Sequence, residues 1–150
     1  MNASMPLVSI IVPIYNVEQY LAECLESLVN QTLRDIEIIC VNDASPDKSK
    51  DIAEQYAMRD SRVRVVSHVK NQGLGPARNT GVENATASYI MFVDSDDVVT
   101  TNMAEKLYSE MISKPVDMVW CNIGAISDDS TMRKKGSDIP TGVFSSTDIL

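Results

Sequence analysis

The sequence predicts an α/β fold with a doubly wound, mostly parallel sheet flanked by helices. Short apolar runs rich in Val and Ile alternate along the chain with segments whose apolar residues recur every three or four positions. The runs are apolar at consecutive positions, which favours strands that helices cover on both faces. In such a sheet ligands bind beyond the carboxyl ends of the strands. The residues that follow each strand are therefore the candidates for function.

Five strands and four helices are expected. The strands cover residues 8–14, 36–41, 63–66, 89–93 and 116–123, and the helices cover about 18–31, 45–59, 77–84 and 103–112. Ser45, Pro46 and Asp47 mark the start of the second helix, since Pro suits a first helical turn. The strand–helix alternation is the pattern of a parallel sheet.

The composition is that of one globular domain with a hydrophobic core, because 44% of the 150 residues are hydrophobic and 23% are charged. The formal net charge is −8, and no run of Lys or Arg could follow a phosphate backbone, so nucleic acid is not an expected partner. Cys24, Cys40 and Cys121 are widely spaced and predict buried, reduced thiols of a cytoplasmic protein. Neither a signal peptide nor a transmembrane segment is expected.

Polar residues follow the first three expected strands. They are Tyr15 and Asn16, then Asn42 and Asp43, then His68, Asn71, Gly73 and Arg78. Tyr15 could stack on a base or pack on the sheet edge, Asp43 could bind a base or ribose or cap a helix, and Arg78 could bind the ligand or form a surface ion pair. His68 is interpreted as an ordinary strand-end residue.

An acidic cluster of Asp94, Ser95, Asp96 and Asp97 follows the fourth strand. Three carboxylates within four residues repel one another, and a divalent cation would relieve that repulsion. Carboxylate oxygens suit Mg²⁺ or Mn²⁺, which can also bridge phosphate oxygens. The alternative is a polar turn in which an Asp caps the next helix.

Four motifs, taken in order, resemble the family-two glycosyltransferases of the Rossmann-like GT-A fold. They are VSIIVPIYN at residues 8–16, VNDAS at 41–45, NQG at 71–73 with ARNTG at 77–81, and FVDSDD at 92–97. The resemblance covers about residues 7–99. Two mild departures are Asn42, where the family often has Asp, and Ala44, where it commonly has Gly.

The resemblance implies an inverting glycosyltransferase that moves a sugar from a nucleotide-diphosphate sugar, expected to be a UDP-sugar, to an acceptor hydroxyl. By position it implies nucleotide binding by Pro13, Tyr15, Asn16, Asp43, Arg78, Asp94 and Ser95, and metal binding by Asp96 and Asp94 in a DxD motif. The implied cofactor is Mn²⁺ or Mg²⁺, which stabilises charge on the departing diphosphate. The acceptor would be a saccharide or a lipid-linked molecule of polysaccharide biosynthesis, and the protein would work in the cytoplasm or at the inner face of the membrane.

We expect a single domain over residues 1–150, with the donor-binding core at about 7–99 and the start of the acceptor half at 100–150. In the family the general base that activates the acceptor lies in that second half, so we expect it beyond Leu150 and the domain to be truncated. Two other functions stay open: a nucleotide-binding module without catalysis, and a phosphatase similar to the haloacid dehalogenases. The latter use a DxDx[TV] string that residues 94–98 match, although usually on the first strand.

Overall fold

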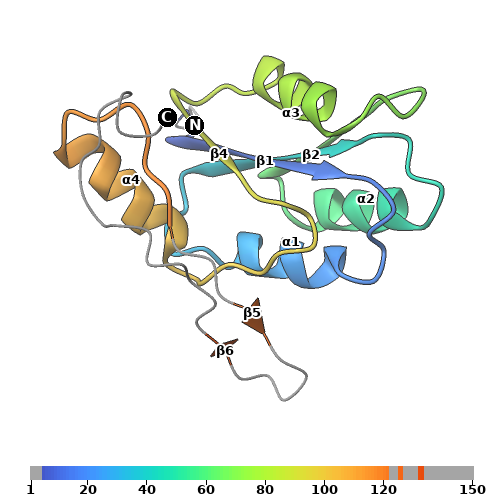
Figure 1. The fold of residues 1–150 in the computed structure, drawn as a ribbon, viewed down its shortest axis with the longest axis horizontal. Helices are drawn as coiled ribbons and strands as arrows, with labels where there is room; N and C mark the ends of the chain where they lie inside the picture. Colours follow the sequence, from blue (N-terminus) through green and yellow to red (C-terminus); the bar gives the residue numbers. More distant parts are fainter. Residues whose placement is uncertain (1–4, 122–124, 127–131, 134–150) are drawn as a thin grey trace. The chain divides into compact units, whose positions relative to one another are not determined.

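The computed structural model describes residues 5–121, 125–126 and 132–133 (Figure 1). The chain divides into two compact units, Met1–Tyr108 and Ser109–Leu150. The first unit holds a four-stranded sheet of β1 (Val8–Ile14), β2 (Ile36–Asn42), β3 (Val63–Ser67) and β4 (Tyr89–Phe92), in the order β3-β2-β1-β4. All three strand pairs are parallel. In the second unit β5 (Ala125–Ile126) pairs antiparallel with β6 (Met132–Arg133).

Helices cover both faces of the four-stranded sheet, as the sequence predicts. The helices are α1 (Leu21–Val29), α2 (Ser49–Arg59), α3 (Leu74–Glu83) and α4 (Met103–Ser113). Figure 1 shows α1 and α2 on one face of the sheet and α3 on the other. None of the helices formed by the described residues is long and apolar enough to cross a bilayer.

The two central strands are buried along their whole length, which explains their consecutive apolar residues. In β2, Ile38 packs into the cluster shared with α1 and α2, whereas its neighbour Ile39 packs with Ala77 of α3. Successive side chains of a strand point to opposite faces, so covering both faces requires apolar residues at both. The expected doubly wound α/β fold is therefore confirmed.

Gly81 lets α3 approach β1 closely. A Cβ atom at this position would lie 2.2 Å from Cγ2 of Ile11, closer than real side-chain carbons approach one another. By contrast, a Cβ at Gly75, about 1.7 turns earlier in the same helix, would meet nothing within 4 Å. The contact at Gly81 fixes how α3, and the loop before it, sit on the sheet.

Several expectations about local structure are wrong. The first helix is Leu21–Val29 instead of about 18–31, and the third helix begins at Leu74 instead of residue 77. The second helix begins at Ser49 instead of residue 45, with Lys48 at its N-cap, and Oδ1 of Asp47 accepts the backbone N–H of Ser49 at 3.0 Å. No strand forms over residues 116–121, since an apolar run alone does not supply the hydrogen-bonding neighbour that a strand needs; residues 122–123 lie outside the described part. Cys121 is exposed, although Cys24 and Cys40 are buried as expected.

Candidate functional site

A cavity opens where the direction of sheet growth reverses. The chain passes from β1 to β2 to β3 on one side, and β4 then joins β1 on the other. The carboxyl ends of β1, β2 and β4 meet there, which is where open α/β sheets bind ligands. The cavity has a volume of about 310 Å³, and its lining residues are Pro13, Ile14, Tyr15, Asp43, Asn71, Gly73, Leu74, Ala77, Asp94, Ser95 and Asp96.

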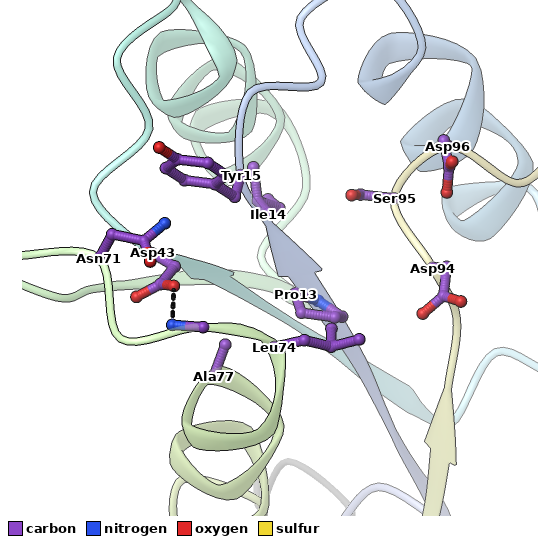
Figure 2. Close-up of a pocket in the computed structure, with 11 residues that line it drawn as sticks. Pro13, Ile14, Tyr15, Asp43, Asn71, Leu74, Ala77, Asp94, Ser95 and Asp96 are labelled. Carbon is purple, nitrogen blue, oxygen red and sulfur yellow. Dashed lines mark hydrogen bonds between the residues drawn. The ribbon is translucent and has the colours of Figure 1, made fainter.

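The cavity has two chemically different walls (Figure 2). Tyr15, Asn71 and Asp43 lie on one side, and the side chains of Asp94 and Asp96 lie across from them. Of the residues expected to bind nucleotide or metal, the cavity is lined by Pro13, Tyr15, Asp43, Asp94, Ser95 and Asp96; Asn16 and Arg78 are absent from the lining. Their roles in binding stay predictions.

Asp43 is a buried carboxylate held by three donors. Its Oδ1 accepts from Nδ1 of His68 at 2.6 Å and from the backbone N–H of Gln72 at 2.8 Å. Its Oδ2 accepts the backbone N–H of Gly73 at 2.7 Å. Burial alone would raise the pKa of Asp43, but these hydrogen bonds outweigh it and lower the pKa below its usual value. Asp43 is therefore ionised in the cavity wall, and it does not cap α2, the alternative left open by the sequence.

His68 joins this carboxylate to α3, although the sequence pattern predicts no role for it. Its side chain is 8% exposed, and Nε2 lies 2.9 Å from Oγ1 of Thr80. The backbone N–H of His68 donates to the carbonyl of Asn42 at 2.9 Å. The position of His68 after β3, at the same sheet edge as Asp43, could have indicated a role in the site. The direction of its ring, however, does not follow from the sequence.

Hydrogen bonds join the loop after β1 to the loop after β2 and to the start of α2. The backbone N–H of Val17 donates to Oγ of Ser49 at 3.1 Å, and the N–H of Glu18 donates to Oδ2 of Asp47 at 2.9 Å. Asn16 and Ala44 have φ values of 55° and 54°, in the left-handed region. Asn16 is part of this turn and outside the cavity lining, and Ala44 stands where the resembled family commonly has Gly.

The acidic cluster brings several negative charges close together. Burial, then Asp96 and Asp94, raises the pKa of Asp97. Burial, followed by the charges of Asp97, Asp96 and Asp94, raises the pKa of the nearby Cys24 thiol to about 12. Cys24 donates from Sγ to the carbonyl of Asp94 at 3.6 Å, which ties α1 to the cluster. A cation or a donor-rich ligand would stabilise this arrangement.

Arg78 of α3 contacts the cluster from beside the cavity. Its Nη2 donates to Oδ1 of Asp94 at 2.8 Å, and its Cζ lies 5.8 Å from the centre of the Phe92 ring. The two side chains of the ion pair are 37% and 50% exposed, so the pair contributes little to stability. Arg78 is placed to orient the carboxylate of Asp94 and to offset its negative charge.

The residues fit a divalent cation only if a ligand completes its coordination. Within the described part of the chain, no group of three or more His, Cys, Asp or Glu side chains is arranged to hold a metal. Asp94 and Asp96 nevertheless both line the cavity. One or two carboxylates, with the remaining positions filled by phosphate oxygens and water, is the usual coordination of Mg²⁺ at phosphate sites.

Comparison with known proteins identifies the family. The model of glycosyl transferase family 2 matches residues 9–148. The chain belongs to this family. The uncharacterized glycosyltransferase EpsJ of Bacillus subtilis (strain 168) is 53% identical over 124 residues, which are 83% of this chain and 36% of EpsJ. The poly(ribitol-phosphate) beta-glucosyltransferase of Bacillus spizizenii is 36% identical over 93% of this chain and 21% of that protein.

Two solved structures share the fold. S. aureus TarS 1-349, crystallised in complex with UDP-GlcNAc, has a TM-score of 0.66 and 31% identity, covering 71% of this chain and 31% of TarS. The mannosyltransferase PcManGT from Pyrobaculum calidifontis has the same TM-score at 23% identity, which shows the fold alone. The expected GT-A fold is thus confirmed. The chain spans 36% to 38% of the length of the first three curated relatives.

Proposed function

We propose that this cavity binds a nucleotide-diphosphate sugar, a UDP-sugar, as the donor site of an inverting glycosyltransferase. The observation that carries the proposal is the pair of opposed walls, with the ionised Asp43 beside Tyr15 on one side and the acidic cluster on the other. The family match supports a transferase over a phosphatase. The TarS structure with UDP-GlcNAc, at 31% identity, supports the class of donor.

The wall of Asp43 and Tyr15 suits the nucleoside. Tyr15 is 49% exposed, so the face of its ring is accessible for stacking on a base. Asp43 is an acceptor that cannot donate while it is ionised, and it therefore selects a base edge that carries an N–H group. Asn71 adds an amide that can donate and accept at the same wall.

The opposite wall suits the diphosphate together with a cation. In the proposal Asp96 and Asp94 hold Mn²⁺ or Mg²⁺, which supplies positive charge to the diphosphate when bound. Ser95, which is 6% exposed and lines the cavity between them, offers a hydroxyl to the ribose or to phosphate. Arg78 keeps one oxygen of Asp94 engaged and limits the repulsion among the carboxylates before the ligand arrives.

The reaction follows from where the donor lies. An acceptor hydroxyl, on a saccharide or a lipid-linked molecule, attacks the anomeric carbon from the face opposite the diphosphate, and the configuration inverts as the C–O bond to the diphosphate breaks. A general base takes the hydroxyl proton. Because the diphosphate wall lies on the far side of the sugar, this base belongs to the acceptor side and not to Asp94, Asp96 or Asp97. A cytoplasmic location, with the acceptor at the inner face of the membrane, is part of the same proposal.

Calorimetric titration of the 150-residue chain with UDP tests the donor site. We expect binding in Mn²⁺ that is at least about tenfold weaker in EDTA and in Asp96→Ala, the size expected for losing a strong charged contact. Asp51→Ala removes an exposed carboxylate from α2 and should bind UDP as the unsubstituted chain does. Equal affinity with and without metal would rule out the metal role, and no UDP binding under any condition would rule out the donor site.

A catalytically inactive nucleotide-binding module would bind UDP in the same way. Turnover separates the two functions: release of UDP from a UDP-sugar in the presence of acceptor requires the transferase. The measurement belongs on a chain of the relatives' full length, because the general base is expected beyond Leu150.

A further inference from the structure

His68 lies between the base-side carboxylate and α3. Nδ1 is 2.6 Å from Oδ1 of Asp43, and Nε2 is 2.9 Å from Oγ1 of Thr80. Because an ionised carboxylate has no hydrogen to give, Nδ1 carries the hydrogen of the first bond. In the neutral ring, Nε2 then accepts the hydroxyl hydrogen of Thr80. Each nitrogen has one partner, so the ring cannot turn without breaking both bonds.

The donors around Asp43 leave its two oxygens unequal. Oδ1 already accepts two hydrogen bonds, from His68 and from the backbone of Gln72, whereas Oδ2 accepts one, from the backbone of Gly73. A carboxylate oxygen has room for two donors. Within the part of the chain that the structure describes, the carboxylate therefore has one open acceptor position, on Oδ2, in a residue that lines the cavity.

A single open acceptor position distinguishes among nucleobases. Uracil presents one ring N–H between two carbonyl groups, which one acceptor satisfies. Cytosine presents a ring nitrogen without hydrogen at the same place, which a carboxylate oxygen repels. Guanine presents two adjacent N–H donors, which are satisfied best by both oxygens of a carboxylate, and Oδ1 is already filled.

We propose that His68 is a positioning residue that sets the base selectivity of the site by holding Asp43 with Oδ2 toward the ligand. The proposal rests on the donor site proposed above and goes beyond it by naming the residue that makes the site prefer uracil. Among the described residues, His68 is the only side chain that donates to Asp43; the other two donors are backbone groups of one loop. Without His68, the carboxylate can rotate and present either oxygen, so the preference for an N–H at that place weakens.

The test is a comparison of UDP and CDP affinities, by calorimetry in Mn²⁺, across matched variants. His68→Ala removes the donor to Asp43, whereas His68→Asn keeps a short side chain with an N–H that reaches the same oxygen. We expect the ratio of UDP to CDP affinity to fall on the order of tenfold in His68→Ala, as for the loss of one hydrogen bond to a charged group. His68→Asn should restore most of the ratio.

Variants of Thr80 test the same proposal independently. Thr80→Val removes the hydroxyl that holds Nε2 and should lower the ratio by a smaller factor, while Thr80→Ser should leave it unchanged. A residue that only stabilises the fold would weaken UDP and CDP alike, so an unchanged ratio in His68→Ala overturns the proposal even if affinity falls. If the unsubstituted chain binds UDP but does not prefer it over CDP, the inference fails while the donor site stands; if it binds neither, both fail.

Discussion

Arg78 donates a hydrogen bond from Nη2 to Oδ1 of Asp94 at 2.8 Å, which joins α3 to the loop after β4. These two residues are separated by 16 positions and belong to different motifs of the sequence. In the described part of the chain, the only ion pair of the acidic cluster thus comes from α3, which covers the opposite face of the sheet from α1. The charge that balances Asp94 and the orientation of its carboxylate both depend on Arg78.

Replacing Arg78 with Ala should weaken UDP binding in Mn²⁺ by about tenfold, because Asp94, Asp96 and Asp97 then lose their neighbouring cation before an anionic ligand binds. The free energy of unfolding should change by less than about 1 kcal/mol, since the pair is exposed. Calorimetry and urea denaturation measure the two quantities. Arg59→Ala, at the end of α2, is the control for loss of positive charge. An unchanged UDP affinity would show that Arg78 forms only a surface ion pair and does not support UDP binding.

Gly81→Ala should destabilise the protein by about 1–3 kcal/mol, because the new Cβ meets Ile11 at 2.2 Å in a packed layer. Gly75→Ala is the matched control in the same helix: its Cβ meets nothing within 4 Å, and we expect it to be stabilising by up to about 1 kcal/mol. Urea midpoints of the two variants test this. If Gly81→Ala were as stable as Gly75→Ala, the close approach of α3 to β1 would be refuted.

Glu37 should make stability depend on pH in acid. Burial by itself would raise its pKa, but hydrogen bonds from Ser9, Thr86 and Arg64 dominate and lower it from 4.5 to about 2. A depressed folded-state pKa stabilises the protein above the unfolded value, and this contribution is lost as pH falls from about 4.5 toward 2. Between pH 6 and pH 3 the loss from this group amounts to about 2 kcal/mol.

The matched variant for this prediction is Glu37→Gln, which keeps the shape of the side chain and removes its titration. Its unfolding free energy should be lower than that of the unsubstituted chain at pH 6 and should fall less between pH 6 and pH 3. Parallel pH profiles of the two proteins, measured by urea denaturation, would contradict the assignment of this acid dependence to Glu37.

Ala44→Gly should be neutral or stabilising by up to about 1 kcal/mol, which is unusual for a substitution by Gly. Ala44 has a φ of 54°, and the strain of a Cβ in the left-handed region costs about as much as the extra backbone entropy of Gly in the unfolded chain, or more. Ala57→Gly, within α2, should cost about 1 kcal/mol. Thermal denaturation distinguishes them, and equal losses in both variants would count against a strained Ala44.

The fold and most of the cavity lining could be predicted because each depends on a short-range pattern. Consecutive apolar residues in β1 and β2 indicate burial on both faces, and parallel strands bring their carboxyl ends to one edge. That reasoning was enough to select Tyr15, Asp43 and the acidic cluster, all of which lie at the cavity except Asp97.

What escaped prediction depends on side-chain direction or on a partner. Asn16 is the second residue after β1, yet it has a left-handed φ in the turn and is absent from the cavity lining. The contact of His68 with Asp43 joins positions 25 apart, and it depends on a ring orientation that no spacing pattern encodes. Residues 116–121 are apolar enough for a strand but form none, because pairing with another strand is not a property of one segment.

The loop before α3 holds Asp43 through main-chain groups alone, the N–H of Gln72 and the N–H of Gly73. Gly73 is constrained by its φ of 94°, but Gln72 is exposed and its side chain takes no part in the bond. Evolution or a designer can therefore exchange the side chain at position 72, beside the mouth of the cavity, without disturbing the carboxylate. The side chain at position 72 can thus vary while Asp43 keeps both of its main-chain hydrogen bonds.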